Sequence, residues 1–308
     1  MDHISLSKTD LLVHPLCLGG NVFGWSADQE ESFEVLNAYT EFNGNFIDTA
    51  DVYCEWKDGN SGHDSETILG NWMKERGNRS EIVIATKVAK LSTRPGLSPT
   101  NIARAVDDSL RALQTDYIDI YYAHEDDLTV PLIDTLHAFN DLITSGKVRY
   151  IAASNYSGAR IQEALAISRA EGFAEYIAVQ NHYNLLVRQE YEAEVAPVIK
   201  EESISGIPYF GLARGFLTGK YRPGRTVESV RAGGVSDYQN ERGYSTVTRL
   251  EEIAKAHHTS IASIALSWLA AQPGVATPIA SARTVEQLHE IVKFPVLTTE
   301  EIDHLSAE

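Results

Sequence analysis

Three consecutive runs of the chain decide its fold: IVIATKV at residues 82–88, PTNIARAVDDSLRAL at 99–113 and YIDIYYA at 117–123. The first and last runs are short, continuous and apolar, as buried strands of a parallel sheet are. The middle run follows a capping serine and repeats apolar residues such as Ile102 and Val106 on one helical face. A strand, a helix and a strand in this order predict a parallel pair joined by a crossover helix.

The same alternation covers the rest of the chain. The predicted strands are 16–18, 45–49, 82–88, 117–123, 148–153, 176–180, 204–210 and 275–280. The predicted helices are 29–42, 64–76, 99–113, 131–144, 158–170, 189–201, 247–257 and 285–292, with an extra helix at 261–271. Eight strands with eight crossovers predict a single α/β domain over residues 1–308, a (β/α)8 TIM barrel. A doubly wound open sheet is the alternative, but it needs a longer Gly-rich fingerprint than Gly19-Gly20 supplies.

Two segments lie outside this pattern. Residues 4–13 alternate loosely around a Lys-Thr-Asp turn, which predicts a β-hairpin that closes the barrel floor. Residues 222–244 are rich in Arg, Gly and Ser, and we expect them to form a mobile loop above the site.

Acidic residues outnumber basic ones, since 43 Asp and Glu against 26 Lys and Arg give a formal net charge of −17. Such a surface repels nucleic-acid phosphates and anionic lipid headgroups, so we expect neither nucleic-acid nor membrane partners. No run reaches the roughly 18 apolar residues of a transmembrane helix, and the N-terminal MDHISLSKTD lacks the regions of a signal peptide. These features predict a cytoplasmic protein.

The chain has two cysteines, Cys17 and Cys54. Two are too few for a disulfide framework, and their spacing does not match a zinc site. We therefore expect two free thiols and no metal site.

Polar residues stand at the ends of three consecutive predicted strands, where the active sites of such barrels lie. They are Asp48, Tyr53, Lys87 and His124. A phenol donates its proton poorly at neutral pH unless a cation stabilises the phenolate; Lys87 is the predicted cation and Asp48 its partner. Tyr53 is then the predicted general acid, and His124 orients the substrate carbonyl. Each residue alone fits a structural role as well, but the four together indicate a catalytic site.

Two tryptophans, Trp25 and Trp56, follow the first two predicted strands. Their flat apolar rings fit the wall of a substrate pocket that takes sugar or aromatic faces. Anchoring of the loops is the open alternative.

With these residues the chain resembles the aldo-keto reductase family, whose signature Asp, Tyr, Lys and His match Asp48, Tyr53, Lys87 and His124. The resemblance extends over nearly the whole chain. Its other motifs are Ser154-Asn155, Gln180-Asn181, GFLTGKY at 215–221 and RTVEQ at 283–287. The joint order and spacing of these motifs are far more specific than any one of them.

The resemblance implies hydride transfer from a nicotinamide to the carbonyl carbon of an aldehyde, ketone or sugar, while the tyrosine protonates the oxygen. It implies that Ser154, Asn155 and Gln180 hydrogen-bond the nicotinamide carboxamide and that Tyr209 stacks on the ring. Ser154 and Asn155 also fit the cap of the next helix. In the segment that wraps the pyrophosphate, the implied contacts are Gly211, Leu212, Gly215, Leu217 and Lys220.

The cofactor implied by the resemblance is NADP(H). Arg283 stands where the family binds the 2′-phosphate, and a guanidinium suits a phosphate better than a ribose hydroxyl. Gln287 and Glu290 match the residues on the adenine side. The chain departs from the family pattern at Ile291, where Asn is usual, and at Phe210, where Ser is usual.

Two alternatives to carbonyl reduction stay open. The same site supports an NADP-dependent sugar or alcohol dehydrogenase that works in the oxidative direction. The other is a regulatory subunit that resembles the potassium-channel beta subunits, which keep this barrel and these four residues but serve as binding partners; shared architecture is its only support.

Overall fold

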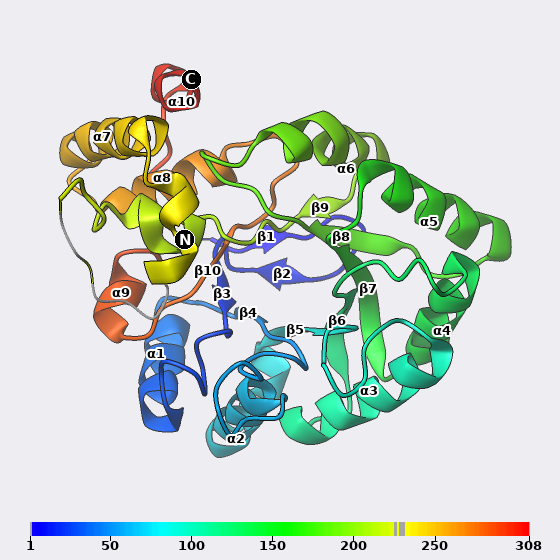
Figure 1. The fold of residues 1–308 in the computed structure, drawn as a ribbon. Helices are drawn as coiled ribbons and strands as arrows, with labels where there is room; N and C mark the ends of the chain where they lie inside the picture. Colours follow the sequence, from blue (N-terminus) through cyan, green and yellow to red (C-terminus); the bar gives the residue numbers. More distant parts are fainter. Residues whose placement is uncertain (1, 225–226, 228–231, 308) are drawn as a thin grey trace.

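Eight parallel strands form one sheet that curls into a barrel, and helices surround it (Figure 1). The computed structural model describes residues 2–224, 227 and 232–307. The strands, in the order of the sheet, are β10 (Ile279–Ala280), β3 (Cys17–Gly19), β4 (Phe46–Asp48), β5 (Val83–Val88), β6 (Ile118–Ala123), β7 (Val148–Ser154), β8 (Tyr176–Gln180) and β9 (Ser205–Gly206). The predicted (β/α)8 barrel is confirmed.

The barrel closes between the segments that contain β9 and β10. The amide of Ala276 donates to the carbonyl of Gly206 at 2.8 Å, and the amide of Ile279 donates to the carbonyl of Pro208 at 3.0 Å. Two of the predicted strands, 204–210 and 275–280, are regular over only two residues each. Each contains a proline, which has no N–H to donate to a neighbouring strand, so the ladder is interrupted there.

Ten α-helices are present in the described part of the chain. They are α1 (Gln29–Glu41), α2 (Asp64–Arg76), α3 (Pro99–Leu113), α4 (Leu132–Thr144), α5 (Gly158–Glu171), α6 (Ala196–Glu202), α7 (Glu241–Ala256), α8 (Ile261–Ala270), α9 (Val285–His289) and α10 (Thr299–Ser306). The bounds of α2 and α3 agree with the prediction. The side chain of Ser98 accepts a hydrogen bond from the amide of Asn101, which caps α3 as expected.

Four helices differ from the prediction by three residues or more, and one of them, α9, ends at His289 rather than at residue 292. Residues 189–201 form a π-helical turn at Tyr191–Val195 before α6, because Pro197 has no N–H to donate to the preceding turn. The helix predicted at 247–257 begins at Glu241, where Asn240 caps it. The prediction missed α10, which begins with a capping box of Thr298 and Glu301.

The predicted loop at 222–244 is only partly described. Residues 225–226 and 228–231 lie outside the described residues. The rest holds two short 3-10 turns, η4 (Ala232–Gly234) and η5 (Ser236–Tyr238), and then the first turn of α7. The mobility of this loop stays a prediction.

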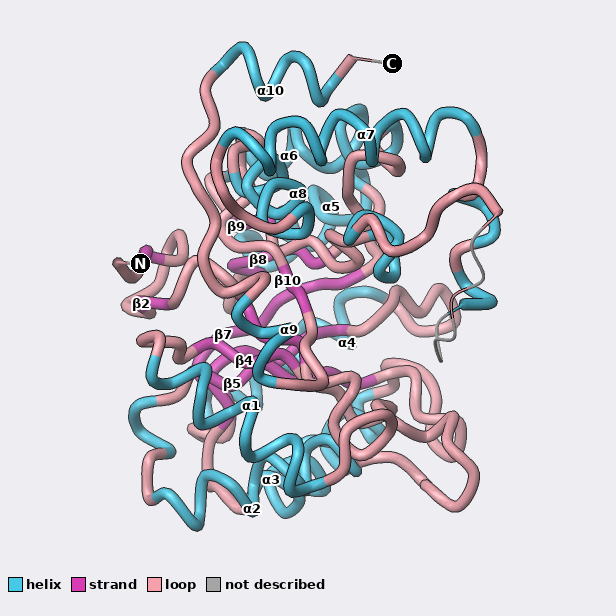
Figure 2. The backbone as a smooth tube through the Cα atoms, turned by 90° about the vertical axis from the view of Figure 1, so that its left-hand side faces the viewer, coloured by secondary structure: helices cyan, strands magenta, loops and turns pink. Residues whose placement is uncertain are grey.

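The N-terminal residues form the predicted hairpin, in which β1 (Ile4–Ser5) pairs antiparallel with β2 (Leu12–Val13). Its buried Leu6 and Leu11 pack against side chains from inside the barrel, among them Phe46. In Figure 2 the hairpin lies at one end of the barrel and long loops lie at the other. The hairpin therefore closes the floor, and the opposite end is open to ligands.

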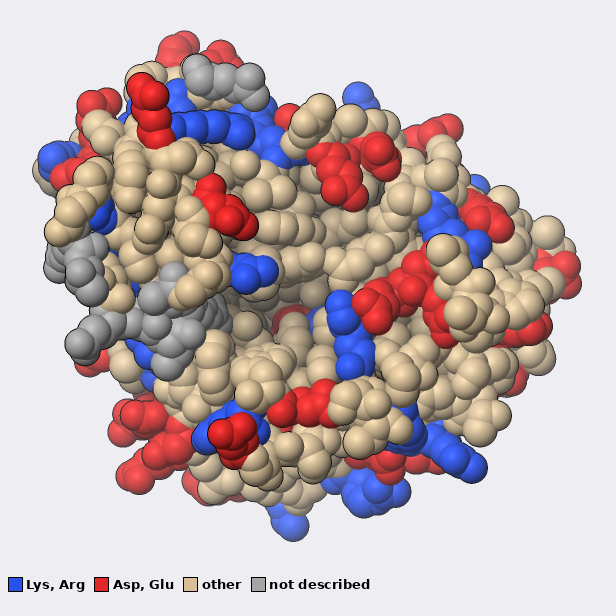
Figure 3. Space-filling model, viewed as in Figure 1, with Lys and Arg blue, Asp and Glu red and all other residues tan. Residues whose placement is uncertain are grey.

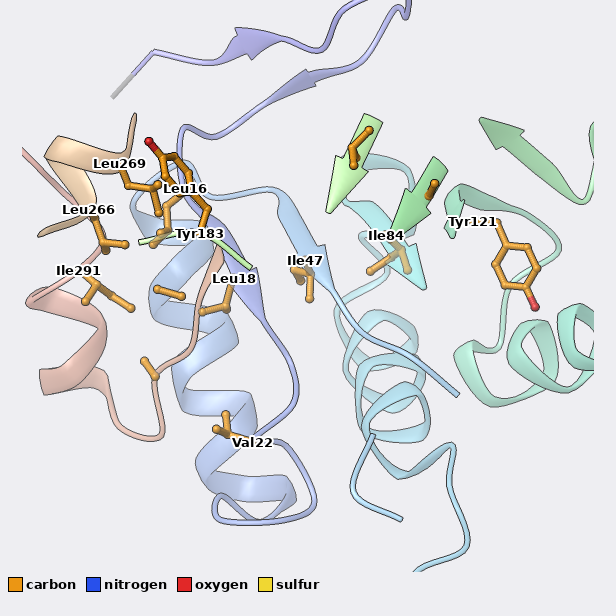
Figure 4. Close-up of a cluster of buried hydrophobic side chains, with 14 of the residues drawn as sticks. Leu16, Leu18, Val22, Ile47, Ile84, Tyr121, Tyr183, Leu266, Leu269 and Ile291 are labelled. Atoms are coloured by element: carbon orange, nitrogen blue, oxygen red, sulfur yellow. The ribbon is translucent and has the colours of Figure 1, made fainter. Parts of the chain in front are cut away.

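Alternation along the strands separates two layers of side chains. Leu18, Ile47 and Ile84 point outward and are fully buried against the surrounding helices (Figure 4). Neighbouring residues on these strands point into the barrel. Asp48, which follows Ile47, and Lys87, three positions after Ile84, therefore point to the barrel interior.

Among the described residues, every helix is too short or too polar to span a bilayer.

Candidate active site

A cavity of about 590 Å³ opens at the C-terminal ends of the strands. Figure 3 shows this hollow near the centre of the molecule, with Lys and Arg side chains at its rim. Fifteen of the predicted site residues line it: Asp48, Tyr53, Trp56, His124, Ser154, Asn155, Gln180, Tyr209, Gly211, Leu212, Gly215, Lys220, Arg283, Gln287 and Glu290. Residues from all parts of the chain thus meet in one place.

A compact hydrogen-bonded group lies at the bottom of the cavity. The hydroxyl of Tyr53 donates to Asp48 Oδ2 at 3.0 Å and accepts from Lys87 Nζ at 2.8 Å. Lys87 Nζ also donates to Asp48 at 2.8 Å and to the carbonyl of Thr49 at 2.7 Å. These three acceptors occupy all three N–H groups of the ammonium, so its position is fixed.

Burial governs the ionisation of this group. Lys87 has no exposed surface and Asp48 only 1%. Burial lowers the pKa of Lys87, and the negative charge of Asp48 opposes that change. Burial and the charge of Asp48 raise the pKa of Tyr53 well above its usual value. Tyr53 therefore keeps its proton at neutral pH in this state.

His124 lies above the tyrosine, with the two ring centroids 6.0 Å apart in an edge-to-face arrangement. Burial, with smaller contributions from the charges of Lys87 and Lys90, lowers the pKa of His124 well below its usual value. The ring is therefore neutral at physiological pH, and one of its nitrogens carries a hydrogen that it can donate.

Gln180 links the bottom of the cavity to the opposite wall. Its side-chain amide donates to Asp48 Oδ1 at 2.8 Å, which connects β8 with β4 across the barrel. The hydroxyl of Ser154, on β7, donates to the backbone carbonyl of Gln180 at 2.8 Å. Gln180 thus bonds Oδ1 of Asp48 and Tyr53 bonds Oδ2, while Lys87 Nζ lies 2.8 Å from each of the two oxygens.

Asn155 and Tyr209 form the next part of the wall. The Tyr209 hydroxyl donates to Asn155 Oδ1 at 2.7 Å, and Asn155 Nδ2 donates to the carbonyl of His124 at 2.8 Å. Asn155 has a φ of 59°, in the left-handed region that Asn tolerates better than most residues. The side chain of Asn155 therefore connects the backbone of His124 to the hydroxyl of Tyr209.

Cationic side chains gather at the other end of the cavity, where Arg214, Lys220 and Arg283 line it. The guanidinium of Arg214 lies over the ring of Phe210, 4.7 Å from its centroid. Within the described residues, Arg214 and Arg283 have no carboxylate partner. In a chain with a net charge of −17, two arginines without acidic partners in one cavity indicate a site for an anionic group.

Three predicted site residues do not line the cavity: Lys87, which is fully buried and bonded to Tyr53, Leu217 and Trp25. Leu217 is fully buried in the core beneath the 211–220 segment, where it packs rather than faces a ligand. Trp25 lies behind Trp56, with the ring centroids 5.6 Å apart at 90°. Trp25 thus supports the wall that Trp56 forms.

Sequence reasoning missed two cations of the site. Arg214 stands within a run of left-handed backbone at Ala213, Arg214 and Gly215, with φ of 46°, 57° and 95°, and no motif points to it. Lys90, three residues after Lys87, lines the cavity and pairs with Glu125 at 3.0 Å. Its place in the loop after β5 was the available signal, because loops at this end of a barrel carry the binding residues.

Both cysteines are free and buried, as expected.

Comparison with known proteins agrees with this architecture. The model of the aldo/keto reductase family matches residues 15–307. The chain is 32% identical to the uncharacterized oxidoreductase YrpG of Bacillus subtilis (strain 168), over 95% of this chain and 90% of the relative. It is 31% identical to the norsolorinic acid reductase of Aspergillus flavus, over 96% and 78% of the two chains. It is also 31% identical to a probable voltage-gated potassium channel subunit beta of Oryza sativa subsp. japonica, over 100% and 96%. The chain therefore belongs to the aldo/keto reductase family of oxidoreductases.

Proposed function

We propose that this protein is an NADPH-dependent reductase of aldehydes, ketones or sugar carbonyls, with Tyr53 as the general acid. One observation carries the proposal: Tyr53 lines the cavity while its hydroxyl is bonded to both Lys87 and Asp48. A phenol in this position can give its proton to a substrate oxygen, and the adjacent ammonium then stabilises the phenolate.

The residues present fit a nicotinamide cofactor. Ser154, Asn155 and Gln180 offer a hydroxyl and two amides on one wall, which suits a carboxamide, and Tyr209 offers a flat ring beside them. Arg283, without an acidic partner among the described residues, suits the 2′-phosphate of NADPH. When bound, NADPH supplies the hydride that the carbonyl carbon accepts.

The residues of the chain then supply orientation and the proton. His124 is neutral, so it can donate a hydrogen bond to the substrate oxygen without competing for the proton of Tyr53. Tyr53 protonates that oxygen, and the product is an alcohol. Trp56, whose ring lies 6.2 Å from that of Tyr53, gives the substrate an apolar wall.

Replacement of Tyr53 by Phe tests the acid role. We expect kcat with NADPH and a panel of aldehydes to fall by about 10²–10⁴-fold, the usual contribution of a general acid, while the Kd of NADPH stays unchanged. The matched control is Tyr156→Phe, because Tyr156 is a buried tyrosine that does not line the cavity. Wild-type turnover in the Tyr53→Phe variant refutes the acid role.

Two alternatives differ in direction or class. The site is chemically reversible, so rates with NADP⁺ and alcohols or aldoses, compared with NADPH and aldehydes, decide which direction dominates. A binding subunit is the second candidate, favoured by the identity with the rice potassium channel subunit. A protein that binds NADPH but reduces no carbonyl compound in the panel supports that candidate instead.

A further inference from the structure

A second buried polar group lies on the outer side of β5. Thr86 and Lys87 are successive residues of this strand, so their side chains point to opposite faces. Lys87 points into the barrel, whereas the hydroxyl of Thr86 donates to Glu66 of α2. The other oxygen of Glu66 is bonded to the ring of His63, the residue that precedes α2.

Asp51 completes this group and has an unusual environment. Its side chain is 1% exposed, and neither carboxylate oxygen has a hydrogen-bond partner among the described residues. Its backbone is well held, because its amide donates to the carbonyl of Lys87 at 3.2 Å and its carbonyl accepts from the amide of His63 at 2.6 Å. Asp51 thus ties both ends of the segment 51–63 to β5.

Charged and titratable groups face Asp51 from each neighbouring element. Glu66 and His63 face it from α2 and its N-terminus, Lys87 from β5, Arg94 from the loop after β5, and Tyr121 from β6. Behind them, Asp108 of α3 is paired with Arg94 at 2.7 Å.

The balance of these charges favours a proton on Asp51. Burial and the negative charge of Glu66 raise its pKa to about 7, against smaller opposing effects of His63, the backbone amide of Val52 and Arg94. Burial opposes protonation of His63, but the bond and the charge of Glu66 raise the pKa of His63 above its usual value. Glu66 is thus paired with His63, whereas Asp51 forms no ion pair with any described residue.

The segment that Asp51 holds carries Tyr53 and is strained. Cys54 and His63 have φ of 76° and 62°, in the left-handed region that non-glycine residues rarely adopt. A Cβ on Gly62 would lie 2.7 Å from the carbonyl of Asp51, so the two ends of the segment approach closely. Such a conformation persists only while its surroundings hold it.

We propose that Asp51 is a positioning residue for Tyr53. While its buried carboxyl keeps a proton, the segment 51–63 holds Tyr53 against Lys87; loss of that proton leaves an unpaired buried anion, which displaces the segment. This inference rests on the proposed role of Tyr53 as the acid. Its consequence is a reductase whose Tyr53 is correctly placed only below a pH near 7.

Trp56 gives a readout that needs no substrate, because it lies within the segment and its ring is near those of Tyr53 and Trp25. We expect the intrinsic fluorescence of the protein without cofactor to change in one transition near pH 7. Asp51→Asn, which resembles the protonated carboxyl, removes the transition, and Trp56→Phe removes its signal. Glu66→Gln moves the transition to lower pH, because the repelling charge is gone.

Turnover provides the second readout. With NADPH and one aldehyde, kcat of the wild type falls about tenfold per pH unit above pH 7. The fall in kcat of Asp51→Asn begins at a pH at least one unit higher. The inference is overturned if fluorescence and kcat of Asp51→Asn follow the wild-type pH curves. If no variant reduces any carbonyl compound but the fluorescence transition depends on Asp51, the inference on the segment stands and the proposed function fails.

Discussion

Asp51 also has a calculable effect on stability. In the unfolded chain its carboxyl has an ordinary pKa of roughly 3.9, whereas burial and Glu66 raise the pKa to about 7 in the folded protein. Between these values the folded protein holds a proton that the unfolded chain has lost. The resulting stabilisation is complete below the unfolded pKa and is lost as the pH rises through the folded one, at about 1.4 kcal/mol per pH unit.

The predicted perturbation is Asp51→Asn, compared with the wild type at pH 5 and pH 8. Two of these three pH units lie below the folded pKa, so the free energy of unfolding of the wild type, relative to the variant, falls by about 2–3 kcal/mol. Urea unfolding followed by circular dichroism at both pH values measures this difference. The matched control is Asp58→Asn, an exposed carboxylate in the same segment, whose difference from the wild type stays constant.

A difference between wild type and Asp51→Asn that does not change with pH refutes the reasoning. Such a result means that the carboxyl of Asp51 has the same protonation in the folded and unfolded chains. Burial without a hydrogen-bond partner then does not keep a proton on Asp51.

Three further predictions test the packing and the charges of the barrel. Lys87→Met leaves Asp48 as a buried anion without its cation, so urea unfolding at pH 7 should show a loss of about 3–5 kcal/mol. Arg283→Gln removes the proposed 2′-phosphate contact, worth about 1.5–3 kcal/mol. Fluorescence titration should show a Kd for NADPH that is raised more than about tenfold and a Kd for NADH that is unchanged. Equal losses of affinity for both cofactors contradict the assignment. Gly70→Ala places a Cβ against the backbone carbonyl of Ala112 in α3, so calorimetry should show a destabilisation of about 1–3 kcal/mol.

The fold could be predicted from the sequence wherever the pattern of apolar residues was uninterrupted. Strands such as β5 and β6 are buried on both faces and stand out as continuous apolar runs. The sequence led to errors at prolines, because a missing N–H changes the local hydrogen bonding without changing the apolar pattern. Pro197 converts one predicted helix into a π-helical turn and α6, and prolines shorten β9 and β10 to two residues each.

The residues at the bottom of the candidate site could be predicted from the sequence for a different reason. Asp48 and Lys87 are polar residues in otherwise apolar strands, and such exceptions are conspicuous. Arg214 and Lys90 were missed because a cation in a loop is ordinary. What marks Arg214 and Lys90 as site residues is that they line the cavity. Their position there depends on the backbone conformation of the loops and on contacts between residues far apart in the sequence.

Strand alternation connects the candidate active site with the buried group around Asp51. Lys87 and Thr86 are neighbours on one strand, so the strand that orients the ammonium toward Tyr53 also carries, on its outer face, the hydroxyl that donates to Glu66. The backbone of Asp51 is hydrogen-bonded to the carbonyl of Lys87 itself. A change of charge on the outer face therefore acts on the placement of Tyr53 through two bonded neighbours, with no need for a long pathway through the protein.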